Sequence, residues 1–197
     1  MGRKVIVSEF VTMDGVMENP VWTVPFNTVE QNQHKFEELL TCDALLLGRI
    51  TYEGFAAAWP KMGETNTVVN QIRDFALPEG FADRMNNYPK YVVSRKKTQQ
   101  QMNWNATLIQ GDLKEEVLKL KGQPGKNILV LGSGELVRTL MQHDLVDEFR
   151  IMIFPVIQGN GRRLFTENIN TMSLKHVNTK TLLSGAVELT YRPSKED

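Results

Sequence analysis

The stretch Ala44-Leu45-Leu46-Leu47-Gly48-Arg49-Ile50-Thr51 carries the strongest indication of the fold. Four consecutive apolar residues that end at Gly48 are typical of a strand buried on both faces of a sheet. Residues from Ile50 to about Ala58 then favour a helix, which we expect Pro60 to end. A buried strand that passes directly into a helix is the unit of parallel α/β sheets, so the stretch predicts this class of fold.

Strands and helices alternate on both sides of this stretch. The other expected strands are 5–7, 90–94, 128–131 and 148–154. The other expected helices are 28–40, 67–77, 112–120 and 133–143. Residues 174–182 and 187–191 predict a terminal hairpin that turns at Ser184-Gly185. The order predicts one domain over residues 1–197, in which a mostly parallel sheet carries antiparallel C-terminal edge strands.

Two of these elements carry an expectation about which face is buried. In the helix over 28–40 the apolar side chains share one face and the polar ones lie elsewhere: Val29, Phe36 and Leu40 against Gln31, Lys35 and Glu38. In the last strand the apolar and polar side chains alternate: Val187, Leu189 and Tyr191 against Glu188, Thr190 and Arg192. We therefore expect the polar half of the last strand to face solvent.

Composition and charge exclude several classes of protein. The chain has 197 residues with 23 basic and 23 acidic side chains, and a net charge of zero argues against a dedicated nucleic-acid binder. Cys42 is the only cysteine, which excludes an internal disulfide, and His34, His143 and His176 lack metal-ligand spacing. We therefore predict no metal site. No apolar run has the length of a membrane span or a signal peptide, so we expect a cytoplasmic protein with no membrane partner.

Two turns have the composition of a phosphate site. Gly48-Arg49-Ile50-Thr51 lies where a buried strand passes into a helix, where exposed N–H groups and the helix dipole favour an anion. Ser94-Arg95 follows the strand over 90–94 and is continued by two lysines. The alternatives are a plain glycine turn beside a solvated arginine, and a solvated run of cations.

A third turn, Gly132-Ser133-Gly134, follows the strand over 128–131 and opens a helix with Glu135 and Leu136. Val137 occupies the position of the third glycine in the dinucleotide fingerprint, so the turn does not match that motif. It is either a backbone cradle for a pyrophosphate or a tight turn without a ligand.

These turns, together with other short motifs, resemble the dihydrofolate reductase-like superfamily in order and spacing. Within it they resemble the reductase domain of bifunctional riboflavin-biosynthesis deaminase-reductases. The further motifs are Met13-Asp14-Gly15, Trp22-Thr23-Val24-Pro25, Leu145-Val146-Asp147-Glu148 and the stretch from Pro155 to Gly161. The resemblance implies a three-layer α/β/α fold, an NADPH-dependent reductase and a homodimer. The zinc-binding segments of the deaminase domain do not occur in this sequence, so we expect a reductase module alone.

The resemblance also implies roles for individual residues. Arg49, Ser94 and Arg95 would contact the 2′-phosphate of NADPH, with Gly48 and Thr51 in the same turn. Gly132, Ser133, Gly134, Glu135 and Leu136 would form the pyrophosphate cradle. Asp14 is the candidate for substrate binding or proton handling, although Asp-Gly is also a common turn. Trp22 would line the substrate site, or serve as a hydrophobic wall.

Three positions depart from the family patterns. Asn27 stands where dihydrofolate reductases carry the carboxylate that binds the pterin, and a neutral amide makes no charge-assisted bond. Glu30, one helical turn further on, is a candidate substitute. Ser8 and Leu131 stand where riboflavin reductases usually carry a lysine and a glutamate.

The predicted function is therefore NADPH-dependent hydride transfer to a pyrimidine- or pteridine-type small molecule. The first expectation is a reductase of the 5-amino-6-(5-phosphoribosylamino)uracil type. The alternatives are a dihydrofolate reductase-like activity, a module that binds NADPH without turnover, and an interaction domain that kept only the fold.

Overall fold

The apolar run after Thr41 forms the strand β2 (Cys42–Gly48), which is buried along its length except at Asp43. The computed structural model describes residues 2–64, 77–167 and 169–194. Its other strands are β1 (Val5–Thr12), β3 (Lys90–Val93), β4 (Ala106–Ile109), β5 (Asn127–Val130), β6 (Glu148–Phe154), β7 (Leu174–Thr181) and β8 (Val187–Pro193). Its helices are α1 (Val29–Leu40), α2 (Arg49–Glu64), α3 (Phe81–Asn87), α4 (Leu113–Gly122) and α5 (Gly134–Gln142), with the short 3-10 helices η1 (Pro20–Phe26) and η3 (Gln99–Gln101).

The described strands form one sheet in the order β4-β3-β2-β5-β1-β6-β8-β7. The six strands from β4 to β6 are parallel, and β8 pairs antiparallel with both β6 and β7. This arrangement confirms the prediction of a parallel sheet with antiparallel C-terminal edge strands. Because parallel strands end at the same edge, the turns after β2, β3 and β5 are brought to one side of the molecule.

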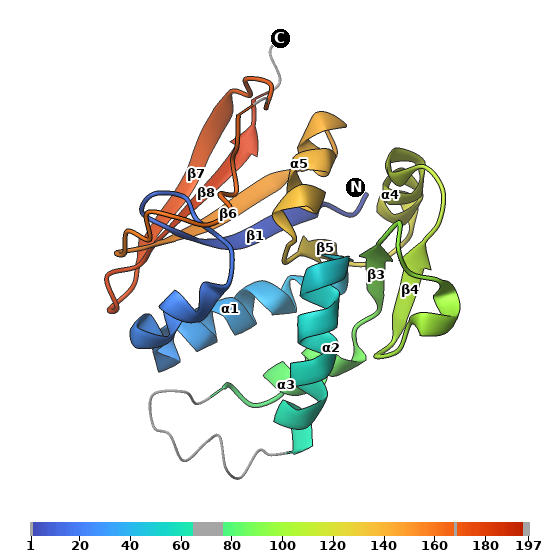
Figure 1. Cartoon of the computed structure of the whole chain (residues 1–197), viewed down its shortest axis with the longest axis horizontal. Helices are drawn as coiled ribbons and strands as arrows, with labels where there is room; N and C mark the ends of the chain where they lie inside the picture. The colour runs from blue at the N-terminus through green and yellow to red at the C-terminus, as the bar shows by residue number, and fades with distance from the viewer. Residues whose placement is uncertain (1, 65–76, 168, 195–197) are drawn as a thin grey trace.

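Helices cover both faces of the sheet, with α1, α2 and α3 on one side and α4 and α5 on the other (Figure 1). Side chains alternate along β1: Val5, Val7 and Val11 pack in the cluster under α4 and α5, whereas Ile6 packs in the cluster with α2 and α3. A third cluster surrounds Phe154 beside η1. The three-layer fold predicted from the sequence is thus confirmed.

Some predicted boundaries were wrong. The second helix does not end at Pro60 but continues to Glu64. The turn before the proline is held by packing, since Trp59 makes an edge contact with Phe81 and its carbonyl accepts a hydrogen bond from Asn86. Helix α3 and strand β4 were not predicted, because both are short and carry weak periodicity. The helix expected over 67–77 lies outside the described residues except for its last position.

The burial expected for α1 and β8 was also wrong, and in the same sense. Gln31 and Glu38 are buried in α1, whereas Val29 is 51% exposed. In β8 the polar side chains of Glu188 and Thr190 are buried. The physical reason is that these two polar faces pack toward each other, so that ion pairs replace apolar contacts between α1 and this part of the sheet.

No helix in the described part of the chain is long and apolar enough to cross a membrane.

Candidate functional site

The turns after β2, β3 and β5 border a groove of about 780 Å³ at the C-terminal edge of the parallel strands. Seven of the predicted cofactor-binding residues line it: Gly48, Arg49, Ser94, Arg95, Ser133, Glu135 and Leu136. Further walls come from β4, the start of α4 and the end of α5. The fold therefore brings together residues that lie far apart in the sequence, at the edge where open α/β sheets bind ligands.

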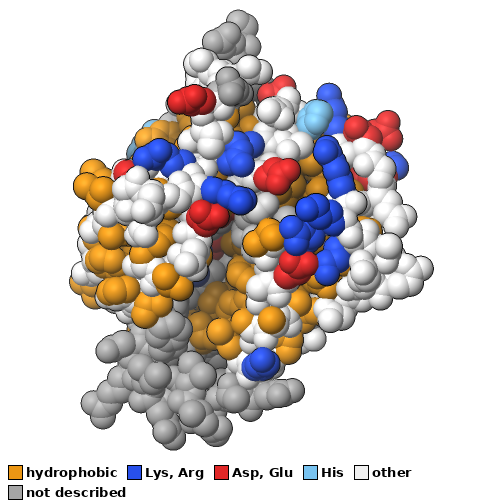
Figure 2. Space-filling view, in the orientation of Figure 1, with side chains coloured by type: hydrophobic (Ala, Val, Ile, Leu, Met, Phe, Trp, Pro, Cys, Tyr) orange, Lys and Arg blue, Asp and Glu red, His pale blue; other side chains and the backbone are white. Residues whose placement is uncertain are grey.

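The groove is rich in cations on the side of β3 and α2. Lys and Arg side chains gather over the start of α2, with acidic side chains nearby (Figure 2). Glu53 links two of the groove's cations, since one carboxylate oxygen lies 2.9 Å from Arg49 Nη1 and the other 2.9 Å from Lys97 Nζ. The Lys97 hydrogen bond, more than Arg49, lowers the pKa of the Glu53 carboxyl. Among the described residues Arg95 and Lys96 form no ion pair, so their charge is available to an anion.

Ser94 organises the turn that follows β3. Its Oγ accepts hydrogen bonds from the backbone N–H groups of Lys96 at 3.1 Å and Lys97 at 3.2 Å. Because Oγ accepts these two bonds, the Ser94 hydroxyl proton remains available for donation to a ligand oxygen. The turn thus presents one hydroxyl donor beside a run of cations.

The turn after β5 lies against the start of α2. Gly132 has a φ of +98°, a conformation that favours glycine, and its carbonyl accepts a hydrogen bond from Gly48 N at 2.9 Å. A methyl group at position 48 would come within 2.8 Å of Ser133 N, and one at position 132 within 2.7 Å of Thr51 Oγ1. Thr51 therefore supports this turn and is not among the residues that line the groove. Gly134 lies beneath Met17, which covers the first turn of α5.

A buried carboxyl lies beside the same turn. Glu9, on β1, is 7% exposed, and its Oε1 has no hydrogen-bond partner among the described residues. That oxygen lies 3.7 Å from the position that a Gly132 methyl group would take. Burial raises the pKa of the Glu9 carboxyl to about 8, although the nearby Lys35 acts in the opposite direction. Glu9 is therefore largely protonated at neutral pH.

On the other face of β1, a layer of charged side chains separates α1 from the sheet. We call Lys35, Glu38, Arg150 and Glu188 the α1 ionic layer. Lys35 Nζ lies 2.6 Å from Glu38 and 3.7 Å from Glu188, and Arg150 lies 3.6 Å from Glu38. Burial alone would raise the pKa of Glu188, but the hydrogen bond from His34 and the charge of Lys35 lower it.

Lys35 also donates a hydrogen bond to Ser8 Oγ. A cation from α1 thus contacts position 8, where the riboflavin-type pattern has a lysine. Sequence reasoning missed Lys35 because it placed this residue outside the buried face of α1. The i, i+3 spacing of Lys35 and Glu38 on a helix was the available signal.

Trp22 and Asn27 lie just before the N-terminal end of α1, in and directly after η1. Trp22 is buried against Phe154, with ring centroids 5.5 Å apart, and its Nε1 donates to the Glu18 carbonyl. Asn27 Oδ1 is buried and has no hydrogen-bond partner in the part of the chain that the structure describes, so it can accept a hydrogen bond from a ligand. Glu30 faces elsewhere, because its carboxylate accepts a hydrogen bond from Leu183 N at 2.7 Å. It does not take the place of the carboxylate missing at position 27.

Asp14 is fully engaged by the loops around it. Its carboxylate accepts hydrogen bonds from Thr12 Oγ1 at 2.6 Å, Gln158 N at 3.1 Å and Gly159 N at 2.9 Å. The Thr12 bond, followed by the Gln158 bond, lowers the pKa of the Asp14 carboxyl to about 2. This geometry gives Asp14 a loop-holding role, and proton handling by this residue stays a prediction.

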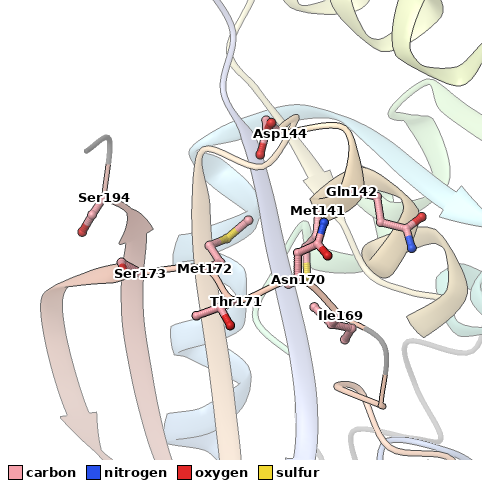
Figure 3. A pocket seen from close by; sticks show the side chains of 9 residues that line it. All are labelled: Met141, Gln142, Asp144, Ile169, Asn170, Thr171, Met172, Ser173 and Ser194. Carbon is pink, nitrogen blue, oxygen red and sulfur yellow. The ribbon is translucent and has the colours of Figure 1, made fainter. Parts of the chain in front are cut away.

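A second cavity, of about 480 Å³, lies between the end of α5 and the segment before β7 (Figure 3). Asp144 is the only ionisable side chain among its nine lining residues, which otherwise present methionine, isoleucine, amide and hydroxyl groups. Without cations it does not suit a phosphate-bearing ligand. The groove beside β3 is therefore the better candidate site.

Comparison with known proteins agrees with this geometry. The sequence pattern of the family described as the RibD C-terminal domain matches residues 3–187. The chain belongs to this family. It is 32% identical to the uncharacterized protein YyaP of Bacillus subtilis strain 168 over 189 residues, which cover 96% of this chain and 94% of YyaP.

Solved structures show the same fold. A putative riboflavin biosynthesis protein from Shewanella sp. PV-4 superposes with a TM-score of 0.64 at 20% identity, covering 99% of this chain and 100% of that one. Dihydrofolate reductase from Enterococcus faecalis, complexed with NADP(H), superposes with a TM-score of 0.59 at 15% identity, covering 98% and 97%. Both the superfamily and the riboflavin-type branch expected from the motifs are confirmed.

Proposed function

We propose that this RibD C-terminal domain protein is an NADPH-dependent reductase. It would transfer a hydride to a pyrimidine- or pteridine-type substrate, in the manner of 5-amino-6-(5-phosphoribosylamino)uracil reductases. The observation that supports this best is the convergence of Arg49, Ser94 and Arg95 on one groove that also reaches the start of α5. Family membership supports it independently.

The residues present suit a dinucleotide phosphate in three respects. The groove has a volume in the range of small-molecule sites, which is roughly 300–1,000 Å³. Arg95 and Lys96 form no ion pair with any described residue, so they can neutralise a phosphate dianion that NADH lacks. Gly48 and Gly132 let the turns after β2 and β5 pack closely at the groove, because a methyl group at either position would clash with Ser133 or Thr51. We infer that Arg49, Ser94 and Arg95 hold the 2′-phosphate, and that Ser133, Glu135 and Leu136 approach the pyrophosphate.

Bound NADPH would supply the hydride, and the chain would supply orientation. The absence of a side chain at Gly132 leaves room for the Thr51 hydroxyl and the Glu9 carboxyl, which would lie 2.7 Å and 3.7 Å from a methyl group at that position. On the substrate side, Asn27 Oδ1 is a hydrogen-bond acceptor that no described residue uses. Lys35 places a cation beside Ser8. Such polar groups suit a heterocycle that donates and accepts hydrogen bonds.

The cofactor part of the proposal is tested by titration calorimetry with NADPH and NADH. Arg95→Ala should weaken NADPH binding by roughly tenfold and leave NADH binding unchanged, because only NADPH carries the 2′-phosphate. Lys175→Ala on the exposed strand β7 is the matched control and should bind both cofactors as the parent does. Equal losses for both cofactors in Arg95→Ala would contradict the assignment.

Turnover separates the remaining alternatives. Oxidation of NADPH should depend on a ribosylamino-pyrimidine or a pteridine, and activity with dihydrofolate would indicate the dihydrofolate reductase-like alternative. Cofactor binding without turnover on any of these substrates would indicate a binding module. Absence of cofactor binding, with Arg49→Ala silent, would indicate an interaction domain.

We also propose that the protein is a cytoplasmic homodimer. Support for the dimer comes from the edge of the sheet, where β7 is almost wholly exposed and presents Leu174 and Val177, each 41% exposed. An unpaired edge strand is a ready surface for a second copy. Sedimentation of the parent and of Val177→Lys should show a dimer that the substitution weakens, and an unchanged mass would contradict this assignment.

A further inference from the structure

Glu53 has no task in the binding scheme above, although it contacts two of the cations that line the groove. It stands four residues after Arg49, about one helical turn along α2, and its Oε2 lies 2.9 Å from Arg49 Nη1. Its Oε1 lies 2.9 Å from the Nζ of Lys97, which belongs to the turn after β3. One carboxylate therefore bridges cations from two different elements of the groove.

The sheet brings these two elements side by side. Strands β2 and β3 are parallel neighbours in which Gly48 pairs with Val93, so the turns that follow them leave the sheet at the same level. The backbone N–H of Lys97 donates to Ser94 Oγ at 3.2 Å, which fixes the position of this residue in its turn. Glu53 adds a second link between the turns, at the level of the charged groups.

Both bridged cations keep hydrogen-bond donors for a ligand. An arginine has five N–H donors and a lysine has three, and the bridge uses one donor of each. Arg49 and Lys97 both line the groove, so the donors that remain can reach a ligand there. Arg95 and Lys96, in the same turn as Lys97, line it as well and form no ion pair with a described residue. This end of the groove thus combines a bridged pair of cations with an unpaired one.

The bridge suits a role in binding better than a role in stability. The side chains of Arg49, Glu53 and Lys97 are 30%, 38% and 25% exposed, and ion pairs that reach solvent contribute little to folding. Without the carboxylate, two like charges would repel each other, and two long side chains would have to be ordered when a ligand binds. Glu53 holds both cations in place before a ligand arrives.

We propose that Glu53 is a positioning residue for the 2′-phosphate, and that Lys97, which it holds beside Arg49, is a further specificity-determining cation. A phosphate dianion would accept hydrogen bonds from the donors that Arg49 and Lys97 keep, while Glu53 retains its contact to both. This inference rests on the proposed function. It adds two residues to which the family resemblance gave no role, and it makes the preference for NADPH over NADH depend on the bridge.

The role of Lys97 is tested by titration calorimetry with 2′,5′-ADP, which carries the 2′-phosphate, and with 5′-AMP, which lacks it. The parent should prefer 2′,5′-ADP. Lys97→Met should weaken 2′,5′-ADP binding by roughly tenfold and leave 5′-AMP binding unchanged, because only the phosphate accepts a charge-assisted bond from this side chain. Lys97→Arg keeps the cation and should stay within about threefold of the parent.

The role of Glu53 is tested in the same titrations. Glu53→Gln keeps the size of the side chain but offers one acceptor oxygen in place of two, so it can hold only one of the cations. It should weaken 2′,5′-ADP binding by roughly three- to tenfold, with 5′-AMP binding and Tm nearly unchanged. The matched controls are Glu116→Gln and Lys119→Met, which break an ion pair of α4 outside the groove lining and should bind both nucleotides as the parent does.

Several results would overturn the inference. Tighter binding of 2′,5′-ADP by Glu53→Gln would show that the carboxylate competes with the phosphate. Unchanged affinities, equal losses for both nucleotides or a large fall in Tm would also contradict a positioning role, and a silent Lys97→Met would overturn the role of Lys97. The proposed function is unaffected by these results as long as the parent prefers 2′,5′-ADP. A parent without that preference would contradict NADPH dependence together with this inference.

Discussion

At the scale of single residues, buried ionisable groups determine much of the expected pH dependence. Glu9 is buried, no described residue bonds to its Oε1, and burial raises its pKa to about 8, well above the ordinary value of 4.5. The folded protein thus holds a proton that the unfolded chain releases above about pH 4.5. Folding stability attributable to this group is complete below that pH and is lost as the pH rises toward about 8.

Glu9→Gln should therefore stabilise the protein more at high pH than at low pH. The free energy of unfolding should rise by a few kcal/mol, up to about 5 kcal/mol, near pH 9, since one pKa unit corresponds to roughly 1.4 kcal/mol. Near pH 4.5 the two proteins should differ little. Urea denaturation at both pH values measures this, and an equal difference at the two would contradict a titrating Glu9.

The turn between β2 and α2 gives a second prediction at this scale. Gly48→Ala should destabilise the protein by about 1–3 kcal/mol, because the new methyl group would lie 2.8 Å from Ser133 N, a backbone atom that cannot turn aside. Gly54→Ala in the following helix α2 is the matched control, with no atom within 4 Å of its methyl group. It should be neutral or stabilising by up to about 1 kcal/mol. Thermal unfolding of both variants measures these changes in stability. A Gly48→Ala variant as stable as the parent would contradict the close contact.

At the scale of elements, the sequence predicted the parallel body well. Continuous apolar runs such as 44–47 can only be satisfied between two helical layers, and the observed β2 is buried on both faces. Helix α1 begins where Thr28 caps it, with Oγ1 accepting from Gln31 N at 3.1 Å. These signals depend only on residues adjacent in the sequence, so they can be recognised without knowledge of the tertiary contacts.

The faces of α1 and β8 could not be predicted in this way. Polar periodicity indicates solvent in most proteins, but here Glu38 and Glu188 are buried because each is paired with a cation of another element. Arg150 of β6 reaches Glu38, and His34 and Lys35 of α1 reach Glu188. Local reasoning tends to fail at functional sites, where structural rules are broken and compensated elsewhere. The α1 ionic layer borders the proposed substrate side, which agrees with that expectation. Lys35 and Glu9 were missed for the same reason.

Removal of Lys35 tests this layer directly. Lys35→Met should destabilise the protein by about 3–5 kcal/mol, because Glu38 and Glu188 would lose their shared cation in a buried setting. Lys35→Arg retains the charge and should cost much less. The free energy of unfolding in urea measures both, and a neutral Lys35→Met would show that the carboxylates do not depend on this cation.

At the scale of the whole molecule, the sheet joins three turns that are about 40 residues apart in the sequence into one groove. The turn after β2 contributes Arg49, the turn after β3 contributes Ser94 and Arg95, and the turn after β5 contributes Ser133. The motifs indicated each turn separately, and only the parallel strand order β3-β2-β5 makes them neighbours. Cofactor selection is therefore a property of the assembled sheet edge.

Thermal unfolding of the parent protein with NADPH, with NADH and without ligand tests that conclusion most directly. A ligand present at about a hundred times its dissociation constant stabilises the folded state by roughly 2.7 kcal/mol. We predict a clear rise in Tm with NADPH and a much smaller one with NADH at the same concentration. Equal rises would contradict the assignment of Arg49, Ser94 and Arg95 to the 2′-phosphate, and no rise with either cofactor would contradict the reductase function itself.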